Sequence, residues 1–190
     1  MSDFIDQRYT DLCNVVSDIN EHLPTLKRYA EECERITEMG TRTVVSTWAF
    51  LSARPKKLVC IDIADCPIEP AQWEAMKLGI DFKFIKADSG DPNFQIEETD
   101  LLLIDTWHCY DHMKKELKLH PQHVNKYLIF HDTTLYADNP ETVDYESLIG
   151  PDFTPKGIWP AIEEFLAEHT EWTIAEKFEN NNGLTVLNRN

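Results

Sequence analysis

The sequence is short of basic residues, of glycine and of long apolar runs. Its 18 lysine and arginine residues stand against 34 aspartates and glutamates, so the formal net charge is −16. Such a chain repels phosphates, which argues against nucleic acid or an anionic membrane as a partner and favours a cationic ligand. No apolar stretch approaches the roughly 18 residues that span a bilayer.

The cysteines also form no pattern that is typical of a metal site or of a set of disulfide bonds. The five cysteines are an odd number and form no CxxC motif, so neither a disulfide scaffold nor a zinc finger is expected. The opening MSDFIDQRYTD has no basic stretch followed by an apolar one, which predicts no signal peptide. We therefore expect a cytoplasmic protein, and 190 residues with 42% hydrophobic content suit one globular domain.

From residue 35 onward, apolar runs of strand length alternate with helical segments. KLVCIDI and DLLLIDT are apolar along their length, which is typical of parallel strands covered on both faces. ENNNG separates the last two strands and predicts an antiparallel hairpin. Strands are predicted at 35–39, 57–63, 82–88, 100–106, 126–133, 172–178 and 184–188, and helices at 44–53, 69–79, 108–120 and 158–169.

This order predicts an α/β fold: a Rossmann-like, seven-stranded, mostly parallel sheet with a C-terminal antiparallel hairpin and helices on both faces. Residues 35–190 form the core of a single domain that covers 1–190. An N-terminal helical extension over 1–33 precedes it, in which Leu12, Val15, Val16, Ile19 and Leu23 follow helical spacing and predict one or two helices over 9–33.

Two segments lie outside the regular alternation. The irregular stretch 134–157 contains three prolines and follows a predicted strand end, so it is a candidate substrate lid. The N-terminal helices could cover a cofactor or form a contact between two copies of the chain, and the sequence does not separate these alternatives.

Polar residues gather where the predicted strands end. Ligands bind at the carboxyl ends of the strands in open α/β sheets. Asp62, after the second strand, could accept hydrogen bonds from two ribose hydroxyls, and Asp88, after the third, could accept an adenine amino group. Either residue could instead cap a turn or a helix. An acid lies at or beside every predicted parallel strand end: Glu38, Asp62, Asp88, Asp105 and Asp132.

The turn EMGTRTVVST follows the first strand and contains a single glycine, Gly40. A phosphate-binding turn in this place usually contains two or three glycines. One glycine gives close approach of the backbone at one point and does not build a cradle for a pyrophosphate. An adenosyl ligand without phosphate needs no more than this.

EMG followed by ST, IDI, KADSGD, LLLIDTWHCY, YLIFHDT and the closing hairpin resemble the class I S-adenosylmethionine-dependent methyltransferases. The resemblance covers about 35–190 and is nearest to the branch of cephalosporin hydroxylase and macrolide-sugar O-methyltransferases. That branch usually has a second glycine near Val44, and the helix between the third and fourth strands is reduced here to SGDPNFQIEET. The resemblance implies that S-adenosylmethionine is bound by Glu38, Gly40, Ser46, Asp62, Asp88, Ser89 and Asp105.

Methyl transfer to a hydroxyl also requires removal of a proton, and a neutral histidine can accept it. His108 and His131 both lie just past strand ends and are the candidate catalytic bases, together with Asp105; each could instead be a hydrogen-bonded structural imidazole. The resemblance places Asp105, His131 and Asp132 as ligands of a metal ion, with Mg²⁺ as the candidate. Because histidine is a poor magnesium ligand, a metal-free enzyme and a different ion are alternatives.

A zinc hydrolase is not expected, although His108 and His112 have the i, i+4 spacing of some zinc sites. HCYDH lacks the glutamate of HExxH and no third ligand is evident. No NPPY-type motif for amino-group methylation is present either.

The sequence therefore predicts an S-adenosylmethionine-dependent O-methyltransferase. The acceptor is a small hydroxylated molecule such as a sugar, which the resemblance alone implies. We expect no nucleic acid and no membrane as partner, and a homo-oligomer formed through the N-terminal helices is one arrangement the chain allows. The alternatives are a non-catalytic binding or scaffold protein on a methyltransferase-like fold and an NAD-linked oxidoreductase with a parallel last strand.

Overall fold

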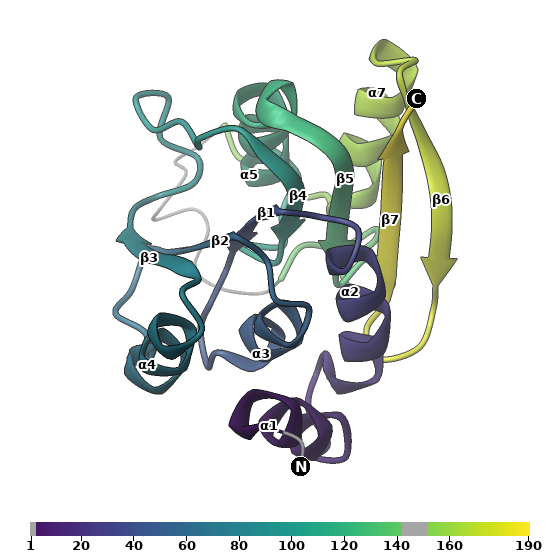
Figure 1. The fold of residues 1–190 in the computed structure, drawn as a ribbon. Helices are drawn as coiled ribbons and strands as arrows, with labels where there is room; N and C mark the ends of the chain where they lie inside the picture. Colours follow the sequence, from purple (N-terminus) through teal and green to yellow (C-terminus); the bar gives the residue numbers. More distant parts are fainter. Residues whose placement is uncertain (1–2, 142–151) are drawn as a thin grey trace.

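The computed structural model describes residues 3–141 and 152–190, which build one seven-stranded sheet with helices on both faces (Figure 1). The strand order is β3-β2-β1-β4-β5-β7-β6. The first five strands are parallel, whereas β7 is antiparallel to both of its neighbours. The strands are β1 (Arg35–Met39), β2 (Lys57–Asp62), β3 (Asp81–Lys86), β4 (Thr99–Ile104), β5 (Val124–His131), β6 (Trp172–Phe178) and β7 (Leu184–Arg189).

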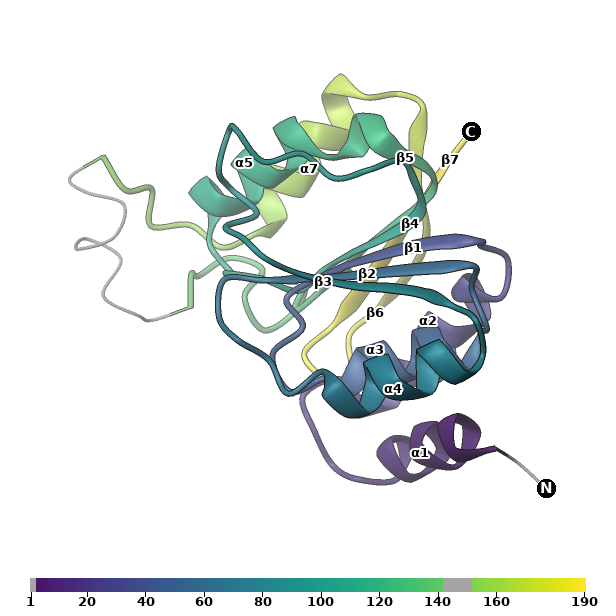
Figure 2. The ribbon, with the colours of Figure 1, turned by 60° about the vertical axis from the view of Figure 1, so that its left-hand side comes forward.

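The helices form a layer on each face of the sheet. Figure 2 shows α2, α3 and α4 on one face, with α1 outside α3, and α5 and α7 on the other face. Their bounds are α1 (Phe4–Cys13), α2 (Leu23–Ala30), α3 (Val45–Ser52), α4 (Glu69–Lys77), α5 (Tyr110–Leu119) and α7 (Trp159–Glu168), with short 3₁₀ turns η1 (Asn20–His22) and η2 (Pro121–His123).

The central strands are apolar throughout because each of their faces lies in a separate core. Successive side chains of a strand point to opposite faces. In β4, Leu101 and Leu103 pack into the core under α1–α4, whereas Leu102 and Ile104 pack into the core under α5 and α7. The continuous apolar runs therefore predicted a parallel sheet covered on both sides correctly.

The predicted elements from residue 35 onward are all present, with ends that differ by two residues or fewer. The closing antiparallel hairpin is confirmed, which removes the parallel last strand expected of an NAD-linked oxidoreductase. Strands β3, β4 and β5 end two residues earlier than predicted. Consequently Asp88, Asp105 and Asp132 lie just beyond the last residues of their strands.

The N-terminal extension differs from its prediction. Helix α1 already starts at Phe4 and ends at Cys13, so Val15 and Val16 belong to no helix, and Val16 is 93% exposed. The chain turns here because the Asn20 side chain accepts a hydrogen bond from the Ser17 amide and donates one to the carbonyl of Cys13. Helices α1 and α2 pack against α3, and Ile5 of α1 is buried.

The candidate lid lies only partly within the described residues, because 142–151 fall outside them. Its described ends are held by backbone hydrogen bonds. Gly157 donates to Asp138, and Glu141 donates to His108, so both ends lie beside the loop after β4. Across the described ranges, no helix is long and apolar enough to cross a membrane.

Gly40 fixes how closely the ends of β1 and β4 approach each other. Its φ is +88°, and a Cβ atom built on it would lie 1.8 Å from the carbonyl oxygen of Asp105. The Asp105 amide donates to Met39 and the Gly40 amide donates to Ile61, so three strand ends meet at this residue. No other amino acid fits here without displacing backbone.

Replacing Gly40 with alanine is therefore expected to destabilise the fold by roughly 3 kcal/mol or more, because a backbone clash adds to an unfavourable φ. The control is Gly79→Ala. Gly79 has a φ of +72° but open space around it, so only the backbone cost of about 1 kcal/mol should apply. Urea unfolding of both variants measures the difference. Equal losses would contradict the close approach described here.

Candidate active site

The turn after β1 has a backbone that glycine would favour, although it contains no second glycine. Arg42 and Val44 both have positive φ, +42° and +66°, and Val44 lies at the place where a second glycine was expected. A β-branched residue in the left-handed region costs on the order of 1–2 kcal/mol. Val44 is buried among apolar side chains, which offsets part of this cost. The turn thus adopts left-handed backbone at two non-glycine positions besides Gly40.

Asp62 at the end of β2 holds this turn in place. One carboxylate oxygen accepts the Arg42 amide at 2.9 Å and the other accepts the Ala64 amide at 2.8 Å. Asp62 is half-buried, and each of its oxygens has lone pairs beyond these bonds. The carboxylate therefore lies beside the motif turn and stabilises the two loops around it.

Glu38 lies beneath the turn, not at its surface. Its side chain is fully buried in β1, and Ser46 and Thr47 of α3 and the thiol of Cys60 donate hydrogen bonds to its carboxylate. Burial raises the pKa of Glu38 to about 7, while these three donors oppose the rise. Two of the predicted cofactor residues, Glu38 and Ser46, are thus hydrogen-bonded to each other under the turn.

Asp88 and Ser89 form the loop after β3. Asp88 is exposed, and one of its oxygens accepts the Gly90 amide at 2.8 Å. Ser89 is buried, and its hydroxyl donates to Glu116 of α5 at 2.6 Å. Of the two residues, only Asp88 presents its side chain to solvent at this edge of the sheet.

Four of the predicted site residues form one cluster after β4 and β5. His108 Nε2 lies 2.9 Å from Asp132 Oδ2 and 3.3 Å from Asp105 Oδ1. His131 Nδ1 lies 3.2 Å from Asp105 Oδ1 and 3.3 Å from Asp132 Oδ2. The parallel pairing of β4 with β5 brings these strand ends side by side. Two carboxylates are thereby shared between two imidazoles.

His108 is surrounded by acids. Glu141 contacts its Nδ1 at 3.1 Å, and Tyr136 stacks on its ring at 4.9 Å between centroids. Burial alone would lower the pKa of His108, but Asp105, Asp132 and Glu141 outweigh it and raise the pKa to about 12. Both ring nitrogens therefore carry protons as long as these carboxylates are negatively charged and no cation balances them.

His131 has one ring nitrogen fixed by carbonyl groups. Its Nε2 lies 3.0 Å from the carbonyl oxygen of Asp18 and 3.2 Å from that of Asn181, so this nitrogen is the donor. Nδ1 then faces Asp105 and Asp132. Burial would lower the pKa of His131, but these two acids raise it to about 10. The ring is 1% exposed, which restricts access to it.

The cluster fits a divalent cation by its chemistry. Ligand atoms of Asp105, His131 and Asp132 lie within 4.8 Å of one another. Asp132 Oδ1 is buried and has no hydrogen-bond partner among residues 3–141 and 152–190, so one carboxylate oxygen is left for a cation. His131 also matches a common feature of metal-binding histidines, whose second nitrogen donates to a backbone carbonyl. Asp132 itself has a φ of +61° at the strand end.

Several residues of this region were not singled out from the sequence. Glu141 and Asn181 come from irregular segments that have no periodicity to place them. Glu116 had one usable signal, because it follows His112 by four residues on an amphipathic helix and is fully buried. Among the aromatic residues, Trp48 and Phe50 are buried, whereas Trp107 is half-buried beside this edge.

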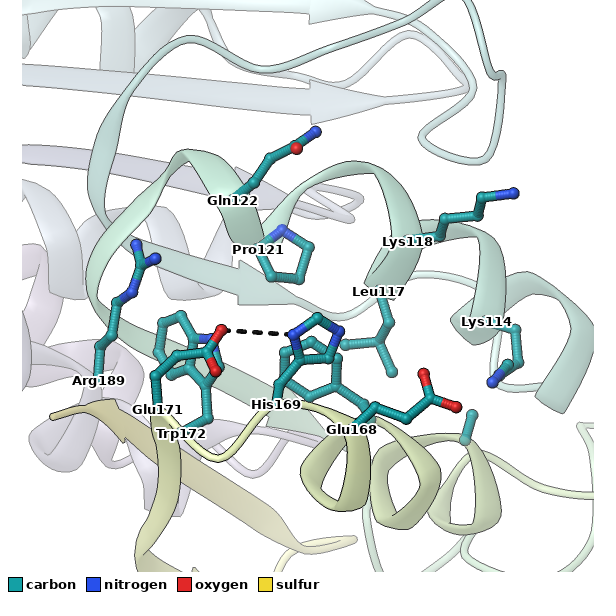
Figure 3. Close-up of a pocket in the computed structure, with 12 residues that line it drawn as sticks. Lys114, Leu117, Lys118, Pro121, Gln122, Glu168, His169, Glu171, Trp172 and Arg189 are labelled. Atoms are coloured by element: carbon teal, nitrogen blue, oxygen red, sulfur yellow. Dashed lines mark hydrogen bonds and ion pairs between the residues drawn. The ribbon is translucent and has the colours of Figure 1, made fainter.

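A separate hollow of about 460 Å³ lies between the C-terminal ends of α5 and α7 (Figure 3). Pro121, Trp172 and Arg189 line it, and His169 contacts Glu171 there at 3.3 Å. These residues lie at the opposite edge of the sheet from Asp105 and Asp132. The hollow is therefore not part of the candidate site.

The raised pKa of Glu38 predicts a pH-dependent stability. Between about pH 4.5 and 7 the folded chain holds a proton that the unfolded chain has released, so stability falls as pH rises through this window. The contribution is at most about 3 kcal/mol. Chemical unfolding at pH 5 and pH 8 should show that wild type loses stability relative to Glu38→Gln. The control is Glu34→Gln, at an exposed position. Parallel pH profiles for wild type and Glu38→Gln would contradict the assignment.

Comparisons with known proteins agree with this geometry. Residues 33–190 match the sequence family described as Rhamnosyl O-methyltransferase/CmcI. No curated protein matches the chain.

Solved structures share the fold at low sequence identity. A putative caffeoyl-CoA O-methyltransferase from Staphylococcus aureus has a TM-score of 0.63 and 14% identity, over 100% of this chain and 93% of that one. The O-methyltransferase TomG from Streptomyces achromogenes, solved with SAM, has a TM-score of 0.59 and 16% identity, over 100% and 91%. The sheet order, the strand-end residues and the family match lead to one conclusion: the chain belongs to the Rhamnosyl O-methyltransferase/CmcI family and has the fold of the class I S-adenosylmethionine-dependent methyltransferases.

Proposed function

We propose that this protein transfers a methyl group from S-adenosylmethionine to a hydroxyl of a small acceptor such as a sugar. The observation that carries the proposal is the adjacency of two groups at one sheet edge. The motif turn held by Asp62 lies on one side of Gly40, and the cluster containing Asp105 lies on the other. Relatives solved with SAM or S-adenosylhomocysteine support the choice of cofactor.

The proposed cofactor site runs along the ends of β2, β1 and β3. Asp62 would accept hydrogen bonds from the ribose hydroxyls, and Asp88 would accept the adenine amino group. Gly40 gives the backbone its close approach. Glu38 and Ser46 support the turn from below through their mutual hydrogen bond, so their contribution to cofactor binding is through the shape of the turn.

In the reaction, the acceptor oxygen attacks the methyl carbon in line with the sulfonium. The new C–O bond forms as the C–S bond breaks, and the bonding electron pair stays on sulfur, which becomes a thioether. Alignment of this kind can supply roughly 7–11 kcal/mol. The hydroxyl proton must also be removed. His108 is the better placed base, because Nε2 of His131 already donates to two backbone carbonyl oxygens.

The charge around His108 decides when it can act as a base. With three acids around it, the raised pKa of His108 keeps the ring protonated. Neutralisation of Asp105 and Asp132 by a bound cation would lower that pKa and free Nε2 to take a proton. We propose that Asp105, His131 and Asp132 hold such a cation, which when bound also orients the acceptor hydroxyl and makes it more acidic.

The donor set bears on the choice of ion. Carboxylates suit Mg²⁺ and Mn²⁺, whereas imidazole suits later transition metals. Mg²⁺, the ion expected from the resemblance, gains little from His131. An ion that accepts both donor types, such as Mn²⁺, is therefore the better match.

A scaffold protein on this fold is the second candidate function. One observation favours it: both Asp62 oxygens already accept backbone amides, so the turn is stable without a ligand. It predicts no affinity for the cofactor. The following titration separates the two functions.

Isothermal titration with S-adenosylhomocysteine is expected to show micromolar binding, with NAD as the control ligand. Asp62→Ala should weaken that binding roughly 10- to 100-fold, because charged hydrogen bonds to the ribose are lost. Asp65→Ala is the matched control, since Asp65 lies three residues further on and its side chain is 86% exposed. Absence of binding by the folded wild-type protein, with and without divalent metal, would support the scaffold function instead.

Metal binding is tested separately, by Mn²⁺ titration followed by electron paramagnetic resonance. Wild type should bind Mn²⁺ more tightly than Mg²⁺, and Asp132→Asn should weaken Mn²⁺ binding about tenfold or more, since a ligand is lost. Asp138→Asn is the control, because Asp138 is an exposed acid near the same strand end. If Asp132→Asn and wild type bind Mn²⁺ equally, the proposed ligand set is wrong.

A further inference from the structure

Helix α5 contains a buried acid that the proposed reaction does not use. Glu116 has no solvent exposure, and its Oε1 accepts hydrogen bonds from Ser89 Oγ at 2.6 Å and Thr106 Oγ1 at 2.7 Å. Ser89 belongs to the loop after β3 and Thr106 to the loop after β4. Two other strands separate β3 from β4 in the sheet, so a single carboxylate oxygen links two distant loops.

His112, one helical turn earlier, completes the arrangement. Its Nε2 lies 3.3 Å from Glu116 Oε1 and 3.2 Å from Ser89 Oγ. Burial disfavours charge on His112, but Glu116 outweighs it and raises the pKa of the imidazole. The same contact lowers the pKa of Glu116 against the effect of its own burial. The two residues therefore form a buried ion pair.

The loop after β3 is fixed by further contacts. His120 Nε2 donates to the Ser89 carbonyl oxygen at 2.8 Å. Gly90 lies against the His112 ring, where a Cβ atom would come within 3.0 Å of the ring carbon Cε1. Three groups of this segment are thus held by contacts: the Ser89 hydroxyl, the Ser89 carbonyl group and the α-carbon of Gly90. Outside it lie the exposed Asp88 and the half-buried Trp107, whose ring is 5.9 Å from that of His112.

The energetics suggest that stability is not the purpose of this pair. Burying two charges costs more solvation than their attraction commonly returns, and apolar residues of similar size often stabilise a core as well or better. Glu116 Oε2 is buried and has no hydrogen-bond partner in the described part of the chain, which adds to the cost. An apolar side chain at position 116, however, could not accept hydrogen bonds from the hydroxyls of Ser89 and Thr106. What the carboxylate supplies is the relative position of two loops.

We propose that Glu116 and His112 are positioning residues that set the loops after β3 and β4 to receive the purine ring of a nucleoside ligand. The inference rests on the proposed function, since the nucleoside is the adenosyl part of the cofactor. It assigns the pair to the purine end of the site only. The metal ligands Asp105, His131 and Asp132 contact neither residue, and their ion affinity should not depend on the pair.

The test compares Glu116→Leu with Glu116→Gln by titration with S-adenosylhomocysteine and with adenosine. Leucine removes the acceptor, so Kd for both ligands should rise at least tenfold and by the same factor. Glutamine keeps an acceptor oxygen for the two hydroxyls, so it should restore affinity to within about threefold of wild type. Thermal unfolding and Mn²⁺ affinity are measured in parallel and should not follow the loss of nucleoside binding.

Asp100 supplies the matched control. It is also a buried carboxylate, which accepts the amides of Glu34 and Arg35 at 3.0 Å each, but it lies at the opposite edge of the sheet. Asp100→Leu should leave both nucleoside affinities unchanged. If it weakens them as much as Glu116→Leu does, the effect is general destabilisation and the inference is overturned.

The remaining outcomes are also decisive. Should Glu116→Leu not fold, Thr106→Val removes one of the two linking hydroxyls at constant shape, and a three- to tenfold weaker binding is expected. Unchanged affinity in the folded Leu or Val variant overturns the positioning of the purine end while the proposed function stands. If wild type itself binds neither ligand, the proposed function fails, and this inference fails with it.

Discussion

The approach of Gly40 to the backbone of Asp105 determines the geometry of the whole strand-end region. Gly40 has no Cβ, so its backbone can lie directly against the carbonyl group of Asp105. The residues that follow β1 and β4 are therefore held close together. The turn held by Asp62 and the cluster around Asp105 are consequently neighbours through one backbone contact. The one glycine of the turn is the residue that makes this contact.

The sequence predicted the sheet well because burial on two faces leaves a strong pattern. Continuous apolar runs such as DLLLIDT predict parallel strands covered on both faces, and the ENNNG turn predicts the antiparallel hairpin. The resemblance grouped Asp105, His131 and Asp132, and the parallel pairing of β4 with β5 brings these strand ends together.

Other features were not predictable because local pattern and tertiary context disagree. Val15 and Val16 have helical spacing, yet the Asn20 side chain turns the chain there and leaves both exposed. The sequence left open that Asp62 caps a turn, and it does accept the Ala64 amide, but its bond from the Arg42 amide, 20 residues away, was not predictable from spacing. The partners of His131, the carbonyls of Asp18 and Asn181, come from segments 113 and 50 residues away in the chain.

The contact with Asp18 links the N-terminal segment, which lies outside the family match, to the candidate site. The family match begins at residue 33, but the carbonyl of Asp18 helps to fix which nitrogen of His131 faces the acids. His22 lies beside the same ring and bonds to the turn between β6 and β7. A contact that orients the His131 ring therefore comes from residues that precede the region matched by the family.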